Sequence, residues 1–169
     1  MAVLKVVYFP ETCLRKKTEL VTEITPEIQQ LVKDMYETMY EENGVGLAAN
    51  QVGVSLRIFT MDVTDDRSQR YCAINPELLS VEGKQEDIEG CLSYPGAYDK
   101  VTRGLKVRFK ALDVEGKPYE MEAEGLMARC VQHEIDHLNG KLFVDHLSRL
   151  KQSRAKKKLE KYLRQEETK

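Results

Sequence analysis

The sequence predicts an α+β domain in which antiparallel β-sheets pack around a central buried helix, with a further helix at the C-terminus. Two patterns predict this class. Residues 105–123 alternate between apolar and charged side chains in two runs separated by a turn, as the strands of a hairpin do. Residues 126–138 instead carry apolar side chains on two sides of a helix, which is typical of a helix enclosed by other elements.

The length of 169 residues is that of one domain with a sizeable core. We expect residues 1–147 to form a single α+β domain that carries the candidate site, and residues 148–169 to form a basic helix of the same domain. The cysteines are scattered without a CxxC pair, and residues 1–5 lack an apolar run preceded by positive charge. We therefore expect a cytoplasmic protein without disulfides, signal peptide or membrane span. The four cysteines are Cys13, Cys72, Cys91 and Cys130.

Charge is distributed unevenly along the chain. The net charge is −2, but residues 149–169 hold nine Lys or Arg against three Glu, a local +6 that leaves −8 on residues 1–148. A basic tail indicates either an acidic partner such as nucleic acid or a solvated helix face. Charge alone favours the solvated face.

The first clear element is a helix that begins after Thr25. Thr25 is a suitable N-cap, and Pro26 suits the first helical position. Apolar residues then recur at helical spacing as far as Asn43-Gly44: Ile28, Leu31, Val32, Met35 and Met39. This pattern predicts an amphipathic helix.

The segment 44–53, Gly-Val-Gly-Leu-Ala-Ala-Asn-Gln-Val-Gly, is too rich in glycine for a regular element and too apolar for an exposed loop. A phosphate-binding loop requires a GK[ST] ending or GxGxxG spacing, and both are absent from the sequence. A structural turn and a loop that lies against a ligand remain as alternatives.

Strands are predicted at residues 56–63 and 71–74, with a polar turn at 65–68 and an end at Asn75-Pro76. Residues 88–96 follow as a loop bounded by turn-forming residues, and Cys91 within it is on its own a small buried apolar residue. In the hairpin at 105–111 and 119–123, three basic side chains oppose three acidic ones on the solvent face.

In the helix at 126–138, one narrow stripe holds Leu126, Cys130, His133 and His137, and a second apolar sector holds Met127, Val131, Ile135 and Leu138. Arg129, Gln132 and Asp136 occupy the remaining flank, either as support for a site or as a salt-bridged edge. Residues 142–144 are expected to be extended. The tail helix then follows with a thin apolar stripe: Leu147, Leu150, Ala155, Leu159 and Tyr162.

The stretch His133-Glu134-Ile135-Asp136-His137 carries the candidate chemistry. Two histidines four residues apart on a helix point the same way and can bind one metal ion, while the intervening glutamate handles a proton. A catalytic metal site needs a third protein ligand. The metzincin pattern fails because Phe143 stands where its third histidine belongs. The remaining candidates are Cys91, Asp145, His146 and Glu160.

Three segments together resemble the signature motifs of the peptide deformylase family in its shorter bacterial form, over essentially the whole chain. They are residues 44–51 (GVGLAANQ), 89–93 (EGCLS) and 132–137 (QHEIDH). The chain differs at Tyr94, where the family often has a small aliphatic residue, and at Asp87-Ile88, where members often have another acidic residue. These differences bear on fine substrate preference.

The resemblance implies a metal-dependent hydrolase that removes the N-formyl group from N-formylmethionyl nascent peptides and releases formate. It implies Cys91, His133 and His137 as metal ligands, with Fe(II) as the native ion and nickel, cobalt or zinc able to replace it. Glu134 then acts as general base and acid. The Gln51 side-chain amide and the Leu92 backbone N–H stabilise the oxyanion.

The resemblance also implies the residues that bind and support. The substrate-binding set is Val45, Gly46, Gly90, Leu126, Arg129 and Cys130. Glu89, paired with Arg103, supports the metal ligands. The basic C-terminal helix is expected to dock on the ribosome, and neither a membrane nor DNA is an expected partner. Two rivals remain: an HExxH endopeptidase with another third ligand, and a metal-stabilised module that binds RNA without catalysis.

Overall fold

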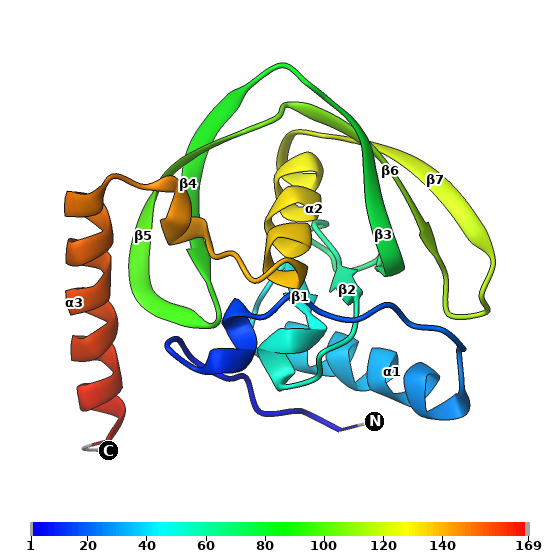
Figure 1. Cartoon of the computed structure of the whole chain (residues 1–169), viewed down its shortest axis with the longest axis horizontal. Coiled ribbons are helices and arrows are strands. Elements are labelled where there is room, and N and C mark those ends of the chain that lie inside the picture. The colour runs from blue at the N-terminus through cyan, green and yellow to red at the C-terminus, as the bar shows by residue number, and fades with distance from the viewer. Residues whose placement is uncertain (1, 168–169) are drawn as a thin grey trace.

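The computed structural model describes residues 2–167 and confirms the α+β class. Helix α2 (Gly125–Leu138) stands at the centre, and the strands arch around it (Figure 1). One sheet has five strands in the order β1-β2-β3-β6-β7 and the other has two, β4-β5, with every pairing antiparallel.

The strands are β1 (Gly46–Ala48), β2 (Ile58–Met61), β3 (Tyr71–Glu82), β4 (Gln85–Cys91), β5 (Tyr94–Arg103), β6 (Lys106–Leu112) and β7 (Pro118–Glu124). The other helices are α1 (Pro26–Glu41) and α3 (Arg149–Glu167). Three short 3-10 helices are η1 (Thr12–Arg15), η2 (Ala49–Val52) and η3 (Phe143–His146). Thr168 and Lys169, the last residues of the predicted tail helix, lie outside the described residues.

Helix α1 begins as the sequence predicts. The Thr25 hydroxyl accepts a hydrogen bond from the Ile28 N–H at 3.3 Å, and Pro26 occupies the first turn, where no N–H donor is needed. The face with Val32, Met35 and Met39 is buried. This face packs in the same core cluster as Leu47 of β1 and so positions the segment 44–48.

The predicted hairpin is the pair β6 and β7. Lys106, Arg108 and Lys110 stand opposite Glu124, Glu122 and Glu120 in the register. The shortest ion pairs run diagonally, with Lys106 on Glu122 at 2.7 Å and Arg108 on Glu120 at 2.8 Å, and Lys106 also pairs with Glu124 opposite it at 3.6 Å. Because these pairs are exposed and screened by solvent, each contributes little to stability, and their effect is to fix register.

Four predicted elements were wrong in their bounds or in their type. Strand β3 passes through Asn75-Pro76 to Glu82, because Asn75 adopts a φ of 53° at a register shift that lets pairing with β6 resume. Strand β2 is shorter than the predicted 56–63. Residues 88–96 are not a loop, since they form the end of β4 and the start of β5. Residues 142–144 were expected to be extended, but only Leu142 is, because η3 begins at Phe143.

Two further expectations need correction. Segment 44–53 contains regular structure, namely strand β1 and helix η2. In α3 the apolar stripe is shorter than predicted, because Leu150 is 61% exposed. Ala155 and Leu159 are buried with Tyr94, Ala97 and Val101 of β5, which attaches α3 to the two-stranded sheet (Figure 1).

The second apolar sector of α2 is confirmed as a core face. Val131, Ile135 and Leu138 pack in the same cluster as Phe59 of β2 and Phe109 of β6. The four cysteines are free. Among the described residues, no helix has the length and apolar character needed to span a bilayer.

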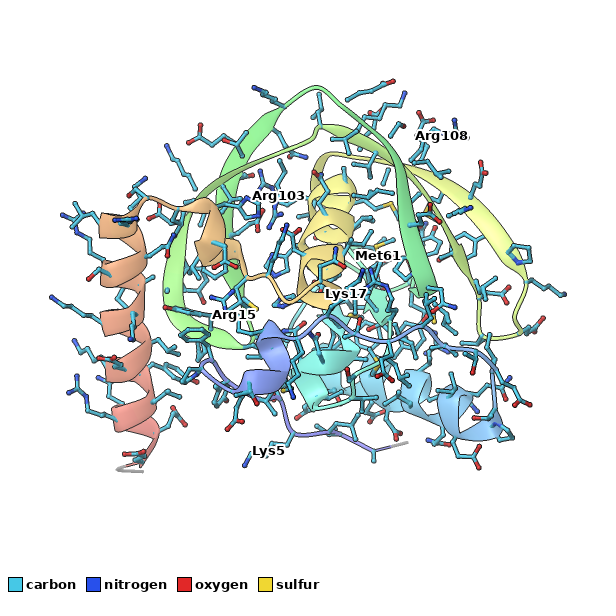
Figure 2. The ribbon with its side chains drawn as sticks, in the orientation of Figure 1. Lys5, Arg15, Lys17, Met61, Arg103 and Arg108 are labelled. Carbon is cyan, nitrogen blue, oxygen red and sulfur yellow. The ribbon has the colours of Figure 1, made fainter. Side chains whose placement is uncertain are left out.

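Charged side chains mostly lie at the periphery, and Arg103 is an exception. Figure 2 shows Arg103 inside the arch between β5 and α2, whereas Lys5 and Arg108 point outward. Arg103 is 5% exposed. A buried guanidinium requires buried anionic partners, which makes its surroundings the natural place to look for a site.

The glycine after α2 provides a test of the fold. Gly140 has a φ of +77°, and an added Cβ would overlap the main chain of Arg15. Gly53 has a φ of +81° with no atom near an added Cβ. We expect Gly53→Ala to lower the free energy of unfolding by about 1 kcal/mol, from the backbone conformation alone. Gly140→Ala should lower it by about 2–4 kcal/mol, because overlap adds to that cost.

Urea denaturation of the two variants measures both losses. Equal losses would contradict the close contact between Gly140 and the Arg15 main chain.

Candidate metal centre

Three potential metal ligands converge between β4 and the central helix. His133 and His137 stand one turn apart on α2, and Cys91 ends β4. The Nε2 atoms of the two histidines are 3.1 Å apart, and the Cys91 Sγ lies 3.2 Å from the His137 Nε2. Within the described residues, these three form the group of His, Cys, Asp and Glu side chains whose ligand atoms could hold one ion, all within 4.8 Å.

The donor set fits a first-row metal ion. Tetrahedral coordination at metal–nitrogen distances of about 2.0–2.1 Å and a metal–sulfur distance of about 2.3 Å puts donor atoms about 3.3–3.6 Å apart. The separations of 3.1 and 3.2 Å are close to that spacing. A thiolate with two imidazoles suits iron, zinc, nickel and cobalt alike, so the ligands do not single out one metal.

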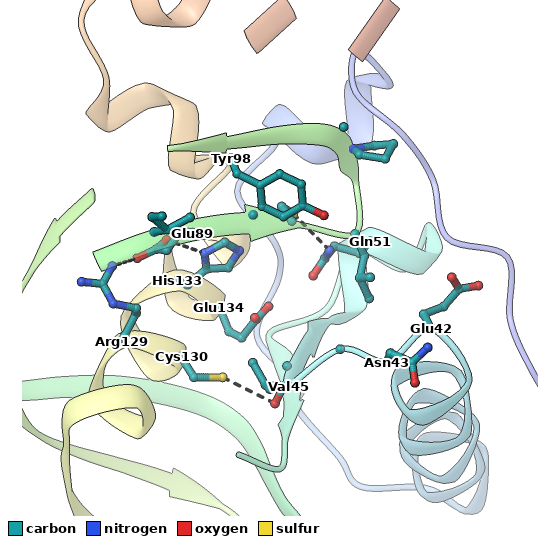
Figure 3. A pocket seen from close by; sticks show the side chains of 18 of the residues that line it. Glu42, Asn43, Val45, Gln51, Glu89, Tyr98, Arg129, Cys130, His133 and Glu134 are labelled. Atoms are coloured by element: carbon teal, nitrogen blue, oxygen red, sulfur yellow. Dashed lines mark hydrogen bonds and ion pairs between the residues drawn. The ribbon is translucent and has the colours of Figure 1, made fainter. Parts of the chain in front are cut away.

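Glu89 orients the first histidine. Its Oε1 lies 2.9 Å from the His133 Nδ1, so that in its neutral form the ring would donate from Nδ1 and keep the Nε2 lone pair for a metal. The other contacts of the carboxylate are with Arg103 Nε and Nη2, both at 2.9 Å, and with Arg129 Nη1 (Figure 3 shows Glu89 between Arg129 and His133). Burial alone would raise the pKa of Glu89, but the hydrogen bonds from His133 and Arg103 outweigh it and hold the pKa well below its usual range.

The charged network continues to the surface. Arg103 Nη1 donates to the Asp136 carboxylate at 2.6 Å, and the His146 Nε2 lies 2.9 Å from the same oxygen. Of the flank residues on α2, the buried Arg129 and the half-buried Asp136 therefore form a salt-bridged edge that also supports the candidate ligands. Gln132 instead caps the turn before β6, because its amide bonds both main-chain groups of Gly104.

Gln51 presents an amide N–H to the site. Its Oε1 accepts from the Ala48 N–H at 2.9 Å, which fixes the orientation of the amide. Its Nε2 then lies 3.1 Å from the Ser93 Oγ and 3.6 Å from the Cys91 Sγ. Because Gln51 is 2% exposed, this donor is held in place before any ligand arrives.

Glu134 lies beside the ligands without a fixed partner. The carboxylate is 4% exposed, and no group in the described chain bonds its Oε1. Burial raises the pKa of Glu134 to about 7, against the opposing charges of His133 and Arg103. A side chain at Gly46 would put its Cβ 2.5 Å from the Glu134 Oε2, so only glycine leaves room for this carboxylate.

Cys91, His133, Glu134 and Gln51 face one cavity of about 570 Å³, whereas His137 is fully buried and is not part of its walls (Figure 3). Its walls include Cys91, His133, Glu134, Gln51 and Leu92. They also include all six residues predicted to bind substrate: Val45, Gly46, Gly90, Leu126, Arg129 and Cys130. The cavity is thus much larger than the ligand group alone and can accept an elongated molecule.

The other candidates for third ligand lie elsewhere. His146 bonds Asp136 and Arg103, and Asp145 forms an ion pair with Arg15 at 2.6 Å. Glu160 is exposed on α3. Cys91 is therefore the candidate that the fold brings to the two histidines.

Several cavity residues were missed by the sequence analysis. Tyr98 on β5, Tyr8 before η1, and Tyr162 on α3 all line the walls. Tyr162 was assigned to the apolar stripe of the tail helix, but no local pattern shows that this stripe reaches the cavity. The role of Ser93, which is buried and supports Gln51 without lining the cavity, was also missed, although Ser93 follows Cys91 by only two residues, because Gln51 lies 42 positions away.

The chain resembles known proteins along nearly its whole length. The family model described as polypeptide deformylase matches residues 3–153. Peptide deformylase 1 of Pseudomonas syringae is 55% identical over 95% of this chain and 96% of its own length. Peptide deformylase of Alkalilimnicola ehrlichii is 52% identical over 98% and 93%. A crystal structure of a peptide deformylase from Legionella pneumophila is 50% identical, has a TM-score of 0.97 and covers 99% of both chains.

A family model over most of the chain, relatives above 50% identity and a matching fold agree with the arrangement of Cys91, His133 and His137. The chain therefore belongs to the polypeptide deformylase family, whose members are metal-dependent hydrolases that remove the formyl group from the N-terminal methionine of polypeptides.

Proposed function

We propose that this deformylase holds one divalent metal ion between Cys91, His133 and His137, with Fe(II) as the native ion and zinc, nickel or cobalt able to replace it. The convergence of these donors beside the partnerless Glu134 carboxylate carries the proposal. When bound, the ion polarises the formyl carbonyl and lowers the pKa of water toward neutrality.

Glu134 moves the proton in this reaction. It accepts the proton of the attacking water as the water oxygen bonds to the formyl carbon. It then donates that proton to the amide nitrogen as the C–N bond breaks and the electron pair passes to nitrogen. The second water proton leaves the formic acid and is taken up by the amine, so the products are formate and a peptide with a free, protonated N-terminus. A pKa of about 7 suits both roles, because the carboxyl group then exchanges a proton readily near neutral pH.

Gln51 and Leu92 stabilise the negative charge that grows on the formyl oxygen. The Gln51 Nε2 supplies one hydrogen-bond donor, and the Leu92 main-chain N–H supplies another from the turn between β4 and β5. The Ala48 N–H and Ser93 hydroxyl hold the Gln51 amide in position, so little reorganisation is needed during reaction.

The substrate is an extended N-formylmethionyl peptide. Leu126, Cys130 and Val45 line an apolar part of the cavity that suits the methionine side chain. Gly46 and Gly90 lie on β1 and β4, where the peptide main chain can run beside a strand. Arg129 contributes to the same wall while it bonds Glu89.

Helix α3 belongs to the catalytic domain in this proposal, with residues 1–147 forming the catalytic part and the tail contacting the ribosome. Ala155 and Leu159 bind the helix to β5, while Lys156, Lys157 and Lys161 are exposed. An exposed row of lysines suits the phosphates of ribosomal RNA.

Replacing Glu134 tests the reaction. We expect Glu134→Ala, loaded with metal without oxygen, to release formate from a formyl-Met tripeptide roughly 100- to 10,000-fold more slowly than the wild type, because the proton acceptor is lost. Its metal content should match the wild type, whereas Cys91→Ala should bind metal poorly. Absence of formate from the loaded wild type would end the proposal, and a Cys91→Ala variant that kept its metal would point to an endopeptidase-type ligand set.

Replacing Glu89 tests the support of His133. Glu89→Gln keeps the shape but weakens the acceptor for His133 Nδ1, so we expect metal affinity to fall about 10- to 100-fold. Competition with a chelator measures this affinity directly. Glu120→Gln, an exposed change on β7, is the control, and equal affinities for the two variants would rule out the support role.

Charge reversal tests the tail. Lys156→Glu combined with Lys157→Glu should weaken ribosome binding and reduce its dependence on salt, because phosphate contacts are lost. Turnover of short peptides should stay unchanged. Lys16→Glu with Lys17→Glu makes the same charge change on an exposed segment elsewhere and serves as the control. Identical ribosome affinities for the two double variants would refute the proposal.

A further inference from the structure

We propose that Arg67 is a positioning residue that fixes the main chain leading into β1, and thereby the strand edge that binds the peptide. This inference rests on the proposed function. Its Nη1 donates to the Gly44 carbonyl and to the Asp62 carbonyl, both at 3.0 Å. The Asp62 N–H donates to the Val45 carbonyl at 2.9 Å. We call Tyr40, Asp62 and Arg67 the β1 clamp.

The clamp restrains a segment whose glycines would otherwise leave it mobile. Gly44 and Gly46 flank Val45, and glycines leave a chain free to move unless outside contacts restrain it. In an antiparallel pair, alternate residues direct their main-chain groups toward the neighbouring strand. The Val45 carbonyl faces Asp62, so Gly46 directs its N–H and C=O away from β2, toward the cavity that it lines.

The clamp is rigid because its anion is buried and fully bonded. Asp62 is 0% exposed. The Tyr40 hydroxyl donates to its Oδ2 at 2.8 Å, and the Thr64 N–H donates to its Oδ1 at 3.0 Å. The Arg67 guanidinium lies 5.5 Å from the centre of the Tyr40 ring. Tyr40 stands at the end of α1, so this contact and its bond to Asp62 connect α1 to the clamp.

The backbone conformation of Arg67 indicates that its side chain has a structural role. Arg67 has a φ of 56°, a conformation that glycine or asparagine adopts more easily than arginine. The turn geometry alone therefore disfavours arginine at this position. The bonds to Gly44 and Asp62 give a reason for its presence.

The expected effect is on binding. Among the described residues, the cavity walls include Asn43, Gly44, Val45 and Gly46 but not Arg67 (Figure 3 labels Asn43 and Val45). A pre-formed edge lowers the ordering needed when a peptide pairs with it. Losing the clamp should therefore raise KM and leave kcat and metal content close to those of the wild type.

The decisive variant is Arg67→Gly. Glycine suits the backbone at a positive φ, so the turn should form as well as before and Tm should stay equal or rise. We expect KM for a formyl-Met tripeptide to rise roughly fivefold or more, because a fivefold loss of affinity corresponds to about one hydrogen bond. Arg67→Lys, which keeps one donor group, should recover part of the loss.

Arg70→Met is the matched control, because Arg70 lies near the same turn but stacks on Tyr36, 4.5 Å from the ring centre. Its KM should equal that of the wild type. An unchanged KM in Arg67→Gly at unchanged Tm would overturn the clamp, as would a fall in kcat or metal content without a change in KM. Failure of the proposed function is distinct, because the wild type itself would then release no formate.

Discussion

The Glu89 carboxylate is the interaction on which the site depends. It lies on β4, and its partners come from β5 through Arg103 and from α2 through Arg129 and His133. A buried carboxylate with four donor contacts fixes the two-stranded sheet against the central helix. Removal of one member of such a network typically costs about 3–5 kcal/mol, because the remaining charges stay buried without compensation. The same contacts that fix the strands therefore fix the ring of His133, a candidate metal ligand.

Elements with strong local periodicity were predictable from sequence. The hairpin β6-β7 and the helices α1 and α2 follow from alternation, capping and helical spacing within short windows. Strand β4 was missed because three consecutive residues, Glu86, Asp87 and Ile88, are exposed and give no alternation. The passage of β3 through Asn75-Pro76 depends on Asn75 bonding both main-chain groups of Val21, 54 residues away. No local pattern contains that contact.

The site residues also divide into those that a local pattern predicts and those that only the fold brings together. The spacing of His133, Glu134 and His137 identified a metal-binding helix by itself, because four residues make about one turn. The residues alone left Cys91, Asp145, His146 and Glu160 as alternatives for the third ligand, and the family resemblance selected among them. Tertiary structure brings Gln51 and Cys91 together across 40 positions. The contact of Arg129 with Glu89 also needed the fold, since a flank position is compatible with several partners.

Strand β1 has a consequence for what the enzyme can act upon. It is an edge strand of three residues, recessed in the wall of a cavity. Exposed sheet edges invite pairing with other proteins, and very short or covered edges avoid it. In the proposed binding mode, an extended chain end reaches the edge inside the cavity. We infer that so short an edge disfavours aggregation, and that a peptide paired with it must be extended over its first residues.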